Sequence, residues 1–278
     1  MEIDKLTPLF ICGHRKSGTT LMVALLDYHP EVIAYPDDSK FFHLYFPKVA
    51  GDDSLTNKEK SDIFIENNLS YLKKVLLERC NADTSYLDFH EFEKIYRKCA
   101  GDDKSWQGAL KAMIYSFYSI SPQKKDKLKY WAEKTTSSEI FALEIKNSFP
   151  KAKFIHIIRD PRDNYASLKS GWDKKYRYMK DSATLEQLRQ SMIERGLLGM
   201  KIGIMNQKVL GDKAYLFVKY ENLVKELDAT LDKIAGFLEI NKSKFDATPT
   251  ACGLKWKGNN MKGKLFDKPS PEQVGRWI

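Results

Sequence analysis

Residues 8–20 constrain the fold of this chain more than any other stretch. Residues 9–12 are an unbroken apolar run, which is typical of a strand covered on both faces in a parallel sheet. Residues 13–20 contain no apolar side chain, and residues 21–26 then show apolar side chains at helical spacing. The stretch therefore predicts a buried strand, a glycine-containing loop and the start of a helix.

A loop of this kind is suited to binding an anion, because the first N–H groups of a helix lack partners within the helix. Gly13 and Gly18 let the backbone come close to a ligand, and Arg15 and Lys16 add positive charge. The glycines have the spacing of the nucleotide-binding pattern G-x4-G-K-[ST], but Thr19 occupies the lysine position and the lysine precedes the second glycine. This departure argues against a nucleoside triphosphatase, whose lysine must reach the β and γ phosphates. The other interpretation is a loop that only begins a helix.

A second turn from strand to helix is predicted at residues 154–168. Its strand, residues 154–158, ends at Arg159, and Ser167 follows eight residues later, about two helical turns away. The planar fork of arginine matches the geometry of a phosphate. The alternative is an arginine–aspartate network that caps the helix, which would explain Asp160 and Arg162. It would not explain why this turn occurs in the same sequence as the first loop.

Two carboxylates follow the second predicted strand, residues 31–35. Asp37 and Asp38, with Ser39 and Lys40, form a polar turn. In an open parallel sheet ligands bind beyond the carboxyl ends of the strands, so this turn is expected to face the same crevice as the first loop. The alternative is an ordinary turn or helix cap, since Asp and Ser are common in both.

A helical insertion is predicted at about residues 52–130, which are rich in lysine and show helical periodicity. We expect several helices packed over one edge of the crevice. The chain then returns to the sheet as a strand that ends in polar residues around Lys134, either at the crevice or on the surface. A helix with Ser137 and Ser138 as caps is predicted over residues 137–149.

The pattern as a whole predicts an α/β fold, a P-loop-like open parallel sheet flanked by helices and carrying a helical insertion. A long amphipathic helix at residues 183–210 and a buried strand at residues 214–220 complete the pattern. With 278 residues and a mass of 32.2 kDa, the chain suits one large domain over residues 1–278.

No apolar run approaches the roughly 18 residues that span a bilayer. The first strand begins by Leu9, which leaves no room for a signal peptide, so we expect either a cytoplasmic protein or a chain from which a membrane anchor has been trimmed. Cys12, Cys80, Cys99 and Cys252 lack the spacing of a metal site or a disulfide framework and are expected to be free thiols.

The formal net charge of +9 is compatible with an anionic partner. The lysines are spread along the whole chain and no nucleic-acid-binding module is present, so nucleic acid is not the expected partner. A multiply charged nucleotide would account for the charge, as would solvated lysines with no binding role.

Residues 14–22, His-Arg-Lys-Ser-Gly-Thr-Thr-Leu-Met, resemble the 5′-phosphosulfate loop of sulfotransferases that use 3′-phosphoadenosine 5′-phosphosulfate (PAPS). Residues 26–30, Leu-Asp-Tyr-His-Pro, are similar to the tyrosylprotein sulfotransferase branch and its bacterial relatives. Further stretches resemble the family in matching order, namely residues 133–135, 159–168, 218–224, 256–260 and 274–277.

The resemblance implies transfer of a sulfuryl group from PAPS to an acceptor hydroxyl or amine, which leaves adenosine 3′,5′-bisphosphate and needs no metal. It implies that Lys16, Asp38 and Lys134 are catalytic, with Asp38 as the base and Lys40 as the cation of its turn. A one-residue insertion in this turn leaves the choice between Asp37 and Asp38 open. The co-substrate-binding residues implied are Arg15, Lys16, Ser17, Gly18, Thr19, Thr20, Arg159, Ser167 and Tyr220, and a C-terminal cover would add Lys262, Lys264 and Ser270.

The acceptor is left open by the sequence, and a protein tyrosine, a carbohydrate, a lipid or a small metabolite all fit. The helical insertion is where acceptor specificity is expected. The oligomeric state is not indicated. Two other functions compete, a nucleotide or small-molecule kinase that uses the first loop for ATP, and a non-catalytic protein that binds nucleotide or nucleic acid.

Overall fold

The computed structural model contains a five-stranded, fully parallel sheet with the strand order β2-β3-β1-β4-β5. The predicted fold class, an open parallel sheet flanked by helices, is confirmed. The strands are β1 (Thr7–Cys12), β2 (Val32–Ala34), β3 (Tyr130–Lys134), β4 (Lys153–Ile158) and β5 (Tyr215–Lys219). The structure describes residues 2–46, 54–80, 86–100, 105–123, 125, 127–175, 182–258 and 267–277.

The first strand lies at the centre of the sheet, and this position decides where a ligand can bind. The chain leaves β1 toward β2 and β3 on one side and later continues to β4 and β5 on the other. Ile11 in β1 is therefore paired with Lys134 in β3 and with Ile155 in β4. The crevice of such a sheet opens above the carboxyl ends of the strands at this change of direction.

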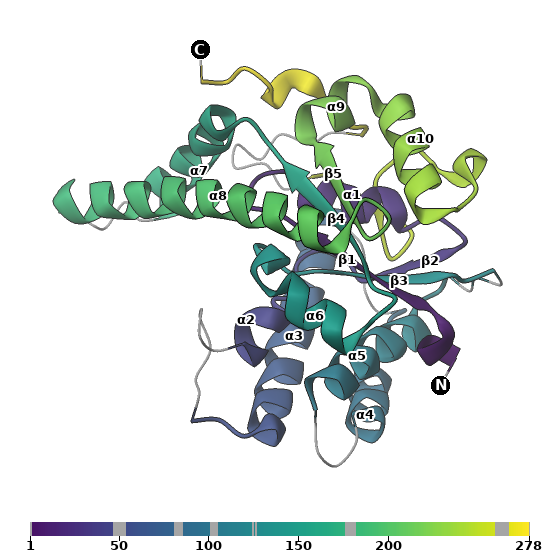
Figure 1. Cartoon of the computed structure of the whole chain (residues 1–278). Coiled ribbons are helices and arrows are strands. Elements are labelled where there is room, and N and C mark those ends of the chain that lie inside the picture. The colour runs from purple at the N-terminus through teal and green to yellow at the C-terminus, as the bar shows by residue number, and fades with distance from the viewer. Residues whose placement is uncertain are drawn as a thin grey trace.

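Side chains of β1 alternate between two hydrophobic clusters, as expected of a strand buried on both faces. Leu9 and Ile11 belong to the cluster beneath α1 (Thr19–Leu26), α9 (Tyr220–Lys225) and α10 (Leu227–Leu238). Phe10 and Cys12 belong to the cluster on the opposite face. That face is covered by the helices of the insertion and by α2 (Phe41–Tyr45) and α6 (Ala142–Ser148), which lie below the sheet in Figure 1.

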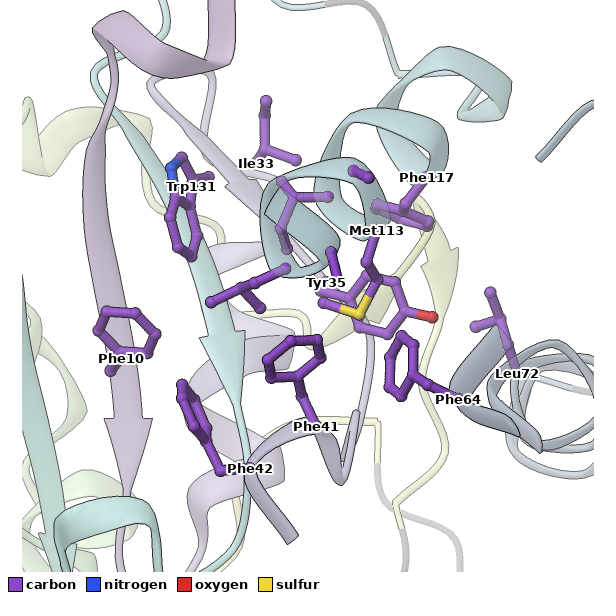
Figure 2. Packing of buried hydrophobic residues seen from close by; sticks show 14 of the residues in the cluster. Phe10, Ile33, Tyr35, Phe41, Phe42, Phe64, Leu72, Met113, Phe117 and Trp131 are labelled. Atoms are coloured by element: carbon purple, nitrogen blue, oxygen red, sulfur yellow. The ribbon is translucent and has the colours of Figure 1, made fainter. Parts of the chain in front are cut away.

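Aromatic rings fill the second cluster (Figure 2). The ring of Phe10 lies 5.5 Å from those of Trp131 and Phe154 and 5.7 Å from that of Phe42. Edge-to-face and offset contacts of this kind add about 0.5–1.5 kcal/mol per pair to the burial term. The cluster thereby fixes α2, and with it the turn that follows β2, against the centre of the sheet.

The helical insertion consists of α3 (Asn57–Cys80), α4 (Phe89–Cys99) and α5 (Trp106–Ile120) within the described residues. Asp88 and Ser105 are side-chain caps of α4 and α5, since each accepts a hydrogen bond from a backbone N–H in the first turn. The last turn of α3 reaches the crevice edge, where the N–H of Lys257 donates to the carbonyl of Arg79 at 3.0 Å.

The helix predicted over residues 137–149 is instead a 3-10 turn, η2 (Ser138–Phe141), followed by α6. The predicted serine cap is wrong, because the Ser137 side chain makes no capping bond and its φ is 62°. The reason is tertiary: the Ser137 N–H donates to the carbonyl of Gly13 at 3.0 Å, which ties this turn to the first loop.

Two further helices are α7 (Pro161–Lys175) and α8 (Ser182–Leu210), and α8 is the long helix predicted at residues 183–210. Among the described residues, no helix is long and apolar enough to cross a membrane. The short elements are η1 (Glu2–Lys5), η3 (Lys242–Lys244), η4 (Pro271–Gln273), β6 (Thr250–Ala251) and β7 (Leu254–Lys255).

Glycines allow α8 to pack closely on the sheet while one of its ends projects from the molecule (Figure 1). A Cβ at Gly203 would lie 2.4 Å from Nδ1 of His156 and 3.0 Å from the ring of Phe217, and one at Gly199 would lie 2.5 Å from Oε1 of Glu139. A side chain at either position would push the helix away from β4 and η2.

We predict that Gly203→Ala lowers the free energy of unfolding by about 1–3 kcal/mol, because overpacking of a filled core costs this much. Gly236→Ala in α10 is the matched control, since no atom of the described residues lies within 4 Å of the place that its Cβ would take. There the change should raise stability by roughly 0.5–1 kcal/mol through helix propensity. Urea unfolding measures the free energy of unfolding of both variants. A stabilised Gly203→Ala protein would contradict the close packing of α8.

Candidate active site

A crevice of about 320 Å³ opens above the carboxyl ends of the strands. Its lining follows the strand order, with the second and third strands at one end and the fourth and fifth at the other. In that order it comprises Asp37 and Asp38 after β2, Lys134 and Thr136 at the end of β3, residues 15, 16 and 18–21 after β1, Arg159 and Ser167 after β4, and Tyr220 after β5.

The loop after β1, residues 13–18, is called here the phosphate loop. Its two glycines are required by close contacts. A Cβ at Gly13 would lie 2.3 Å from the carbonyl oxygen of Ile157 in β4, and one at Gly18 would lie 2.5 Å from the ring of Tyr220. Both glycines also have positive φ, 135° and 104°. The loop therefore lies directly on β4 and on the start of α9.

Side chains from three other segments hold the phosphate loop. The Asn164 amide donates to the carbonyl of Arg15 at 2.7 Å, and the Arg159 guanidinium donates to that of Lys16 at 2.8 Å. At the start of the loop, the N–H of Gly13 donates to the Glu139 carboxylate at 2.9 Å. Burial raises the pKa of Glu139 to about 7. These bonds fix the backbone before any ligand binds.

The centre of the crevice is strongly electropositive. Burial and surrounding cations lower the pKa of Lys16 from its ordinary 10.5 to about 8. These cations are Arg79, Arg15, Arg159 and Lys134. Burial and the surrounding cations make the charged form of Lys16 unfavourable. A bound anion would stabilise that charged form, so the centre of the crevice favours anion binding.

Arg159 forms the β4 end of this electropositive region. Burial lowers the pKa of its guanidinium, whose carbon lies 4.3 Å from the centre of the Tyr220 ring. One of its terminal nitrogens donates to the Gln273 carbonyl at 2.5 Å. Its Nε–H is buried, and no described residue accepts a hydrogen bond from it. With the side chain of Ser167 nearby in the lining, this end suits a phosphate group.

At the β2–β3 end the charges are paired instead. The Lys134 ammonium is 2% exposed and lies 3.2 Å from Oδ2 of Asp38 and 3.6 Å from Oδ1 of Asp37. Burial opposes ionisation of Asp38, but Lys134 and the hydroxyl of Thr136, which donates to Asp38 at 2.5 Å, hold its pKa below the ordinary value. Asp38 is therefore a carboxylate at neutral pH.

The strand alternation of β3 explains how neighbouring residues take different roles. Lys134 faces the acidic turn, whereas Glu133 is fully buried and accepts hydrogen bonds from the hydroxyls of Ser39 and Thr135. Burial raises the pKa of Glu133 to about 7. Glu133 thus fixes the turn after β2 through Ser39, and Lys134 contacts its two aspartates.

Not every residue implied by the sequence reaches the crevice. The hydroxyl of Ser17 donates to the carbonyl of His14 at 2.5 Å, and Ser17 is not in the crevice lining. Lys40 is also not in the crevice lining, and its ammonium lies 4.1 Å from the centre of the Tyr71 ring. Ser270 is part of the lining, while Lys262 and Lys264 lie outside the described residues.

Several lining residues were not anticipated from the sequence. Arg79 and Tyr71 come from α3, Thr136 follows β3, and Gln273 belongs to η4. Arg79 forms an ion pair with Asp37 across 42 positions of sequence. No local pattern marks Arg79, which lies in the last turn of α3, so only the packing of that helix shows its role.

Comparison with known proteins shows the family of this chain. Residues 8–244 match the model of the sulfotransferase family, so the chain belongs to that family. No curated protein matches the sequence.

Solved structures of low sequence identity share the fold. The sulfotransferase domain of the Synechococcus PCC 7002 olefin synthase is 19% identical with a TM-score of 0.58, over 98% of this chain and 88% of that one. The sulfotransferase domain from the curacin biosynthetic pathway is 14% identical with a TM-score of 0.54, over 98% and 90%. A sulfotransferase from Alicyclobacillus acidocaldarius is 13% identical with a TM-score of 0.53, over 90% and 85%.

We predict that Lys134→Met lowers the free energy of unfolding by about 3–5 kcal/mol, because it leaves a buried carboxylate without its counter-charge. The double variant Lys134→Met/Asp38→Asn should recover more than half of that loss. Chemical denaturation of both single variants and the double variant gives the coupling energy. Additive losses would show that the two side chains do not interact as the structure has them.

Proposed function

We propose that this protein transfers a sulfuryl group from PAPS to an acceptor hydroxyl or amine and releases adenosine 3′,5′-bisphosphate. The observation that supports this best is a pair of cations that follow adjacent strands, the half-buried Lys16 after β1 and the buried Arg159 after β4, joined by the bond from Arg159 to the Lys16 carbonyl. Their crevice has one carboxylate-lined end and one end without a carboxylate in its described lining. A donor with phosphate at both ends of an adenosine, and an acceptor that loses a proton, fit these two ends.

In this proposal the 5′-phosphosulfate lies at the start of α1, where the backbone N–H groups of residues 18–20 and the Lys16 ammonium face it. Arg15 adds charge at the rim of the crevice. The 3′-phosphate lies against Arg159 and Ser167, and Tyr220 positions Arg159 through its ring. Ser17 shapes the loop, since both its hydroxyl and its N–H donate to the His14 carbonyl.

The chemistry assigned to the side chains follows from where charge develops. By analogy with phosphoryl transfer, the transition state is loose, so positioning and charge stabilisation dominate. Lys16 and Lys134 would stabilise negative charge on the bridging oxygen and on the sulfuryl oxygens. Asp38, 3.2 Å from the Lys134 ammonium, would accept the acceptor's proton beside the group being transferred.

We predict that adenosine 3′,5′-bisphosphate binds much more tightly than AMP, and that Arg159→Ala weakens it by about 10- to 100-fold, because hydrogen bonds to charged groups contribute about 1.5–3 kcal/mol. Ser167→Ala should weaken it by a smaller factor. Calorimetric titration measures both, and neither variant should alter the weaker binding of AMP to the same extent.

Arg162→Ala is the matched control for this experiment. Arg162 follows Arg159 in the same turn, but its guanidinium pairs with Asp160 at 2.6 Å and lies 3.8 Å from the Trp277 ring, outside the crevice. Its loss should leave nucleotide affinity unchanged. Equal binding of ATP, AMP and the bisphosphate would reject the proposed co-substrate.

We also predict that the affinity for adenosine 3′,5′-bisphosphate falls as the pH rises above about 8, the pKa of Lys16. The protonated amine binds the anion, so each unit above that pKa costs up to about tenfold. Below the pKa the affinity should be level until the two phosphate groups of the bisphosphate take up protons at about pH 6. Lys16→Arg should remove the alkaline fall, because arginine stays charged. An unchanged fall in the arginine variant would assign the titration to another group.

A further inference from the structure

We infer that the β2 end of the crevice is a subsite for a neutral acceptor with several hydroxyl groups, of the carbohydrate type, and that the Asp37–Arg79 ion pair recognises a second hydroxyl beside the one that is sulfated. This inference rests on the proposed function, because it assigns the β4–β5 end to the co-substrate. Arg79 and Asp37 are recognition residues here, and Asp38 remains the proposed base.

The Asp37–Arg79 pair lies on the wall of the crevice and is held from several elements. Asp37 has a positive φ of 57° and accepts hydrogen bonds from Arg79 and, at 3.4 Å, from the hydroxyl of Thr20. The Lys134 ammonium lies 3.6 Å from Oδ1 of Asp37, the same oxygen that accepts from Thr20. Its partner Arg79 is 24% exposed, so one edge of the guanidinium is accessible from the crevice.

Charge balance argues for a neutral acceptor. Around this end of the crevice, Asp37 and Asp38 oppose Arg79 and Lys134, and each carboxylate has a cation within ion-pair distance. A charged acceptor would have to separate one of these pairs, which leaves a buried charge without a partner and costs several kcal/mol. The electropositive surplus lies instead around Lys16 and Arg159, where the co-substrate is proposed to bind.

Polarity argues for hydroxyl groups over an apolar acceptor. The lining that comes from α3, from the turn after β2 and from the end of β3 consists of the four charged residues with Thr136 and Tyr71. The apolar side chains of the crevice lining come from other segments of the chain, and they are Leu21, Val224, Pro249, Trp256 and Pro269. An apolar acceptor would remove water from carboxylate and guanidinium groups without replacing the lost hydrogen bonds.

A sugar hydroxyl replaces those hydrogen bonds, because it can donate to Asp37 and accept from Arg79 at once. Burial raises the pKa of Tyr71 to about 12, so its phenol also stays protonated and able to donate. Tyr71 lines the crevice, and one face of its ring is covered by the Lys40 ammonium. A second hydroxyl beside the one that is sulfated satisfies both groups without adding net charge.

The first experiment measures adenosine 3′,5′-bisphosphate release from PAPS with three acceptor sets: a mixture of neutral mono- and disaccharides, 2-naphthol, and a tyrosine peptide with acidic neighbours. The inference expects faster release with the sugar mixture only. Acceleration by the naphthol or the peptide alone, or by none of the three, would overturn it. Failure of the bisphosphate to bind would instead reject the proposed function itself, so the two failures are distinguishable.

The second experiment assigns the recognition pair. With the accelerating sugar, Arg79→Gln and Asp37→Asn should raise KM by about 10-fold or more, as expected for loss of a hydrogen bond to a charged group, and should change kcat and bisphosphate affinity by less than about threefold. Asp38→Asn should lower kcat by about 10²- to 10⁴-fold, as expected for a general base. An effect of Arg79→Gln on kcat with KM unchanged would overturn the recognition role.

Two further variants guard against loss of folding. Arg79→Gln/Asp37→Asn removes both charges together, so no buried charge is left unpaired, and it should still show the raised KM. Lys74→Gln is the matched control on the same helix, because the Lys74 side chain is 66% exposed and pairs only with Glu78 among described residues. Its kinetics should match those of the unaltered protein, and a raised KM in this control would contradict the specific role of Arg79.

Discussion

The close contact between the phosphate loop and β4 determines most of what this structure can do. Because Gly13 has no side chain, the loop backbone lies against the carbonyl of Ile157, where a Cβ would approach to 2.3 Å. Arg159 directly follows the last residue of that strand and therefore reaches the carbonyl of Lys16 at 2.8 Å. The guanidinium of Arg159 is thus held against the backbone of the phosphate loop, at the residue that carries the Lys16 ammonium.

The order of the strands separates two electrostatic environments within one crevice. Around the phosphate loop and the β4 end, burial lowers the pKa values of Lys16 and Arg159, and the cations that surround Lys16 lower its pKa further, which favours a polyanion. At the β2–β3 end, Lys134 is paired with Asp37 and Asp38, which suits an acceptor that binds without net charge. A parallel sheet achieves this separation because the ends of all its strands lie along one edge.

Features formed by consecutive residues could be predicted from the sequence. The strand, loop and helix of residues 8–20 follow from an apolar run, two glycines and helical spacing, and the structure confirms them as β1, the phosphate loop and α1. The turn with Arg159 and the strand end at Lys134 could also be located, since each joins a buried strand to polar residues. Which of the two aspartates is the base stays a prediction, because both line the crevice.

The sequence by itself determined the class of fold, the family motifs and the local turns, because these depend on short-range backbone preferences and hydrophobic periodicity. Only the tertiary structure decided that α3 brings Arg79 to Asp37, that Ser17 turns toward His14, and that the Ser137 N–H binds the phosphate loop and forces a 3-10 turn. The Ser17 contact spans only three residues and depends on the backbone geometry of the phosphate loop. The contacts of Arg79 and Ser137 join segments far apart in the sequence, and they arise from how helices and turns pack on the sheet, which no local sequence pattern encodes.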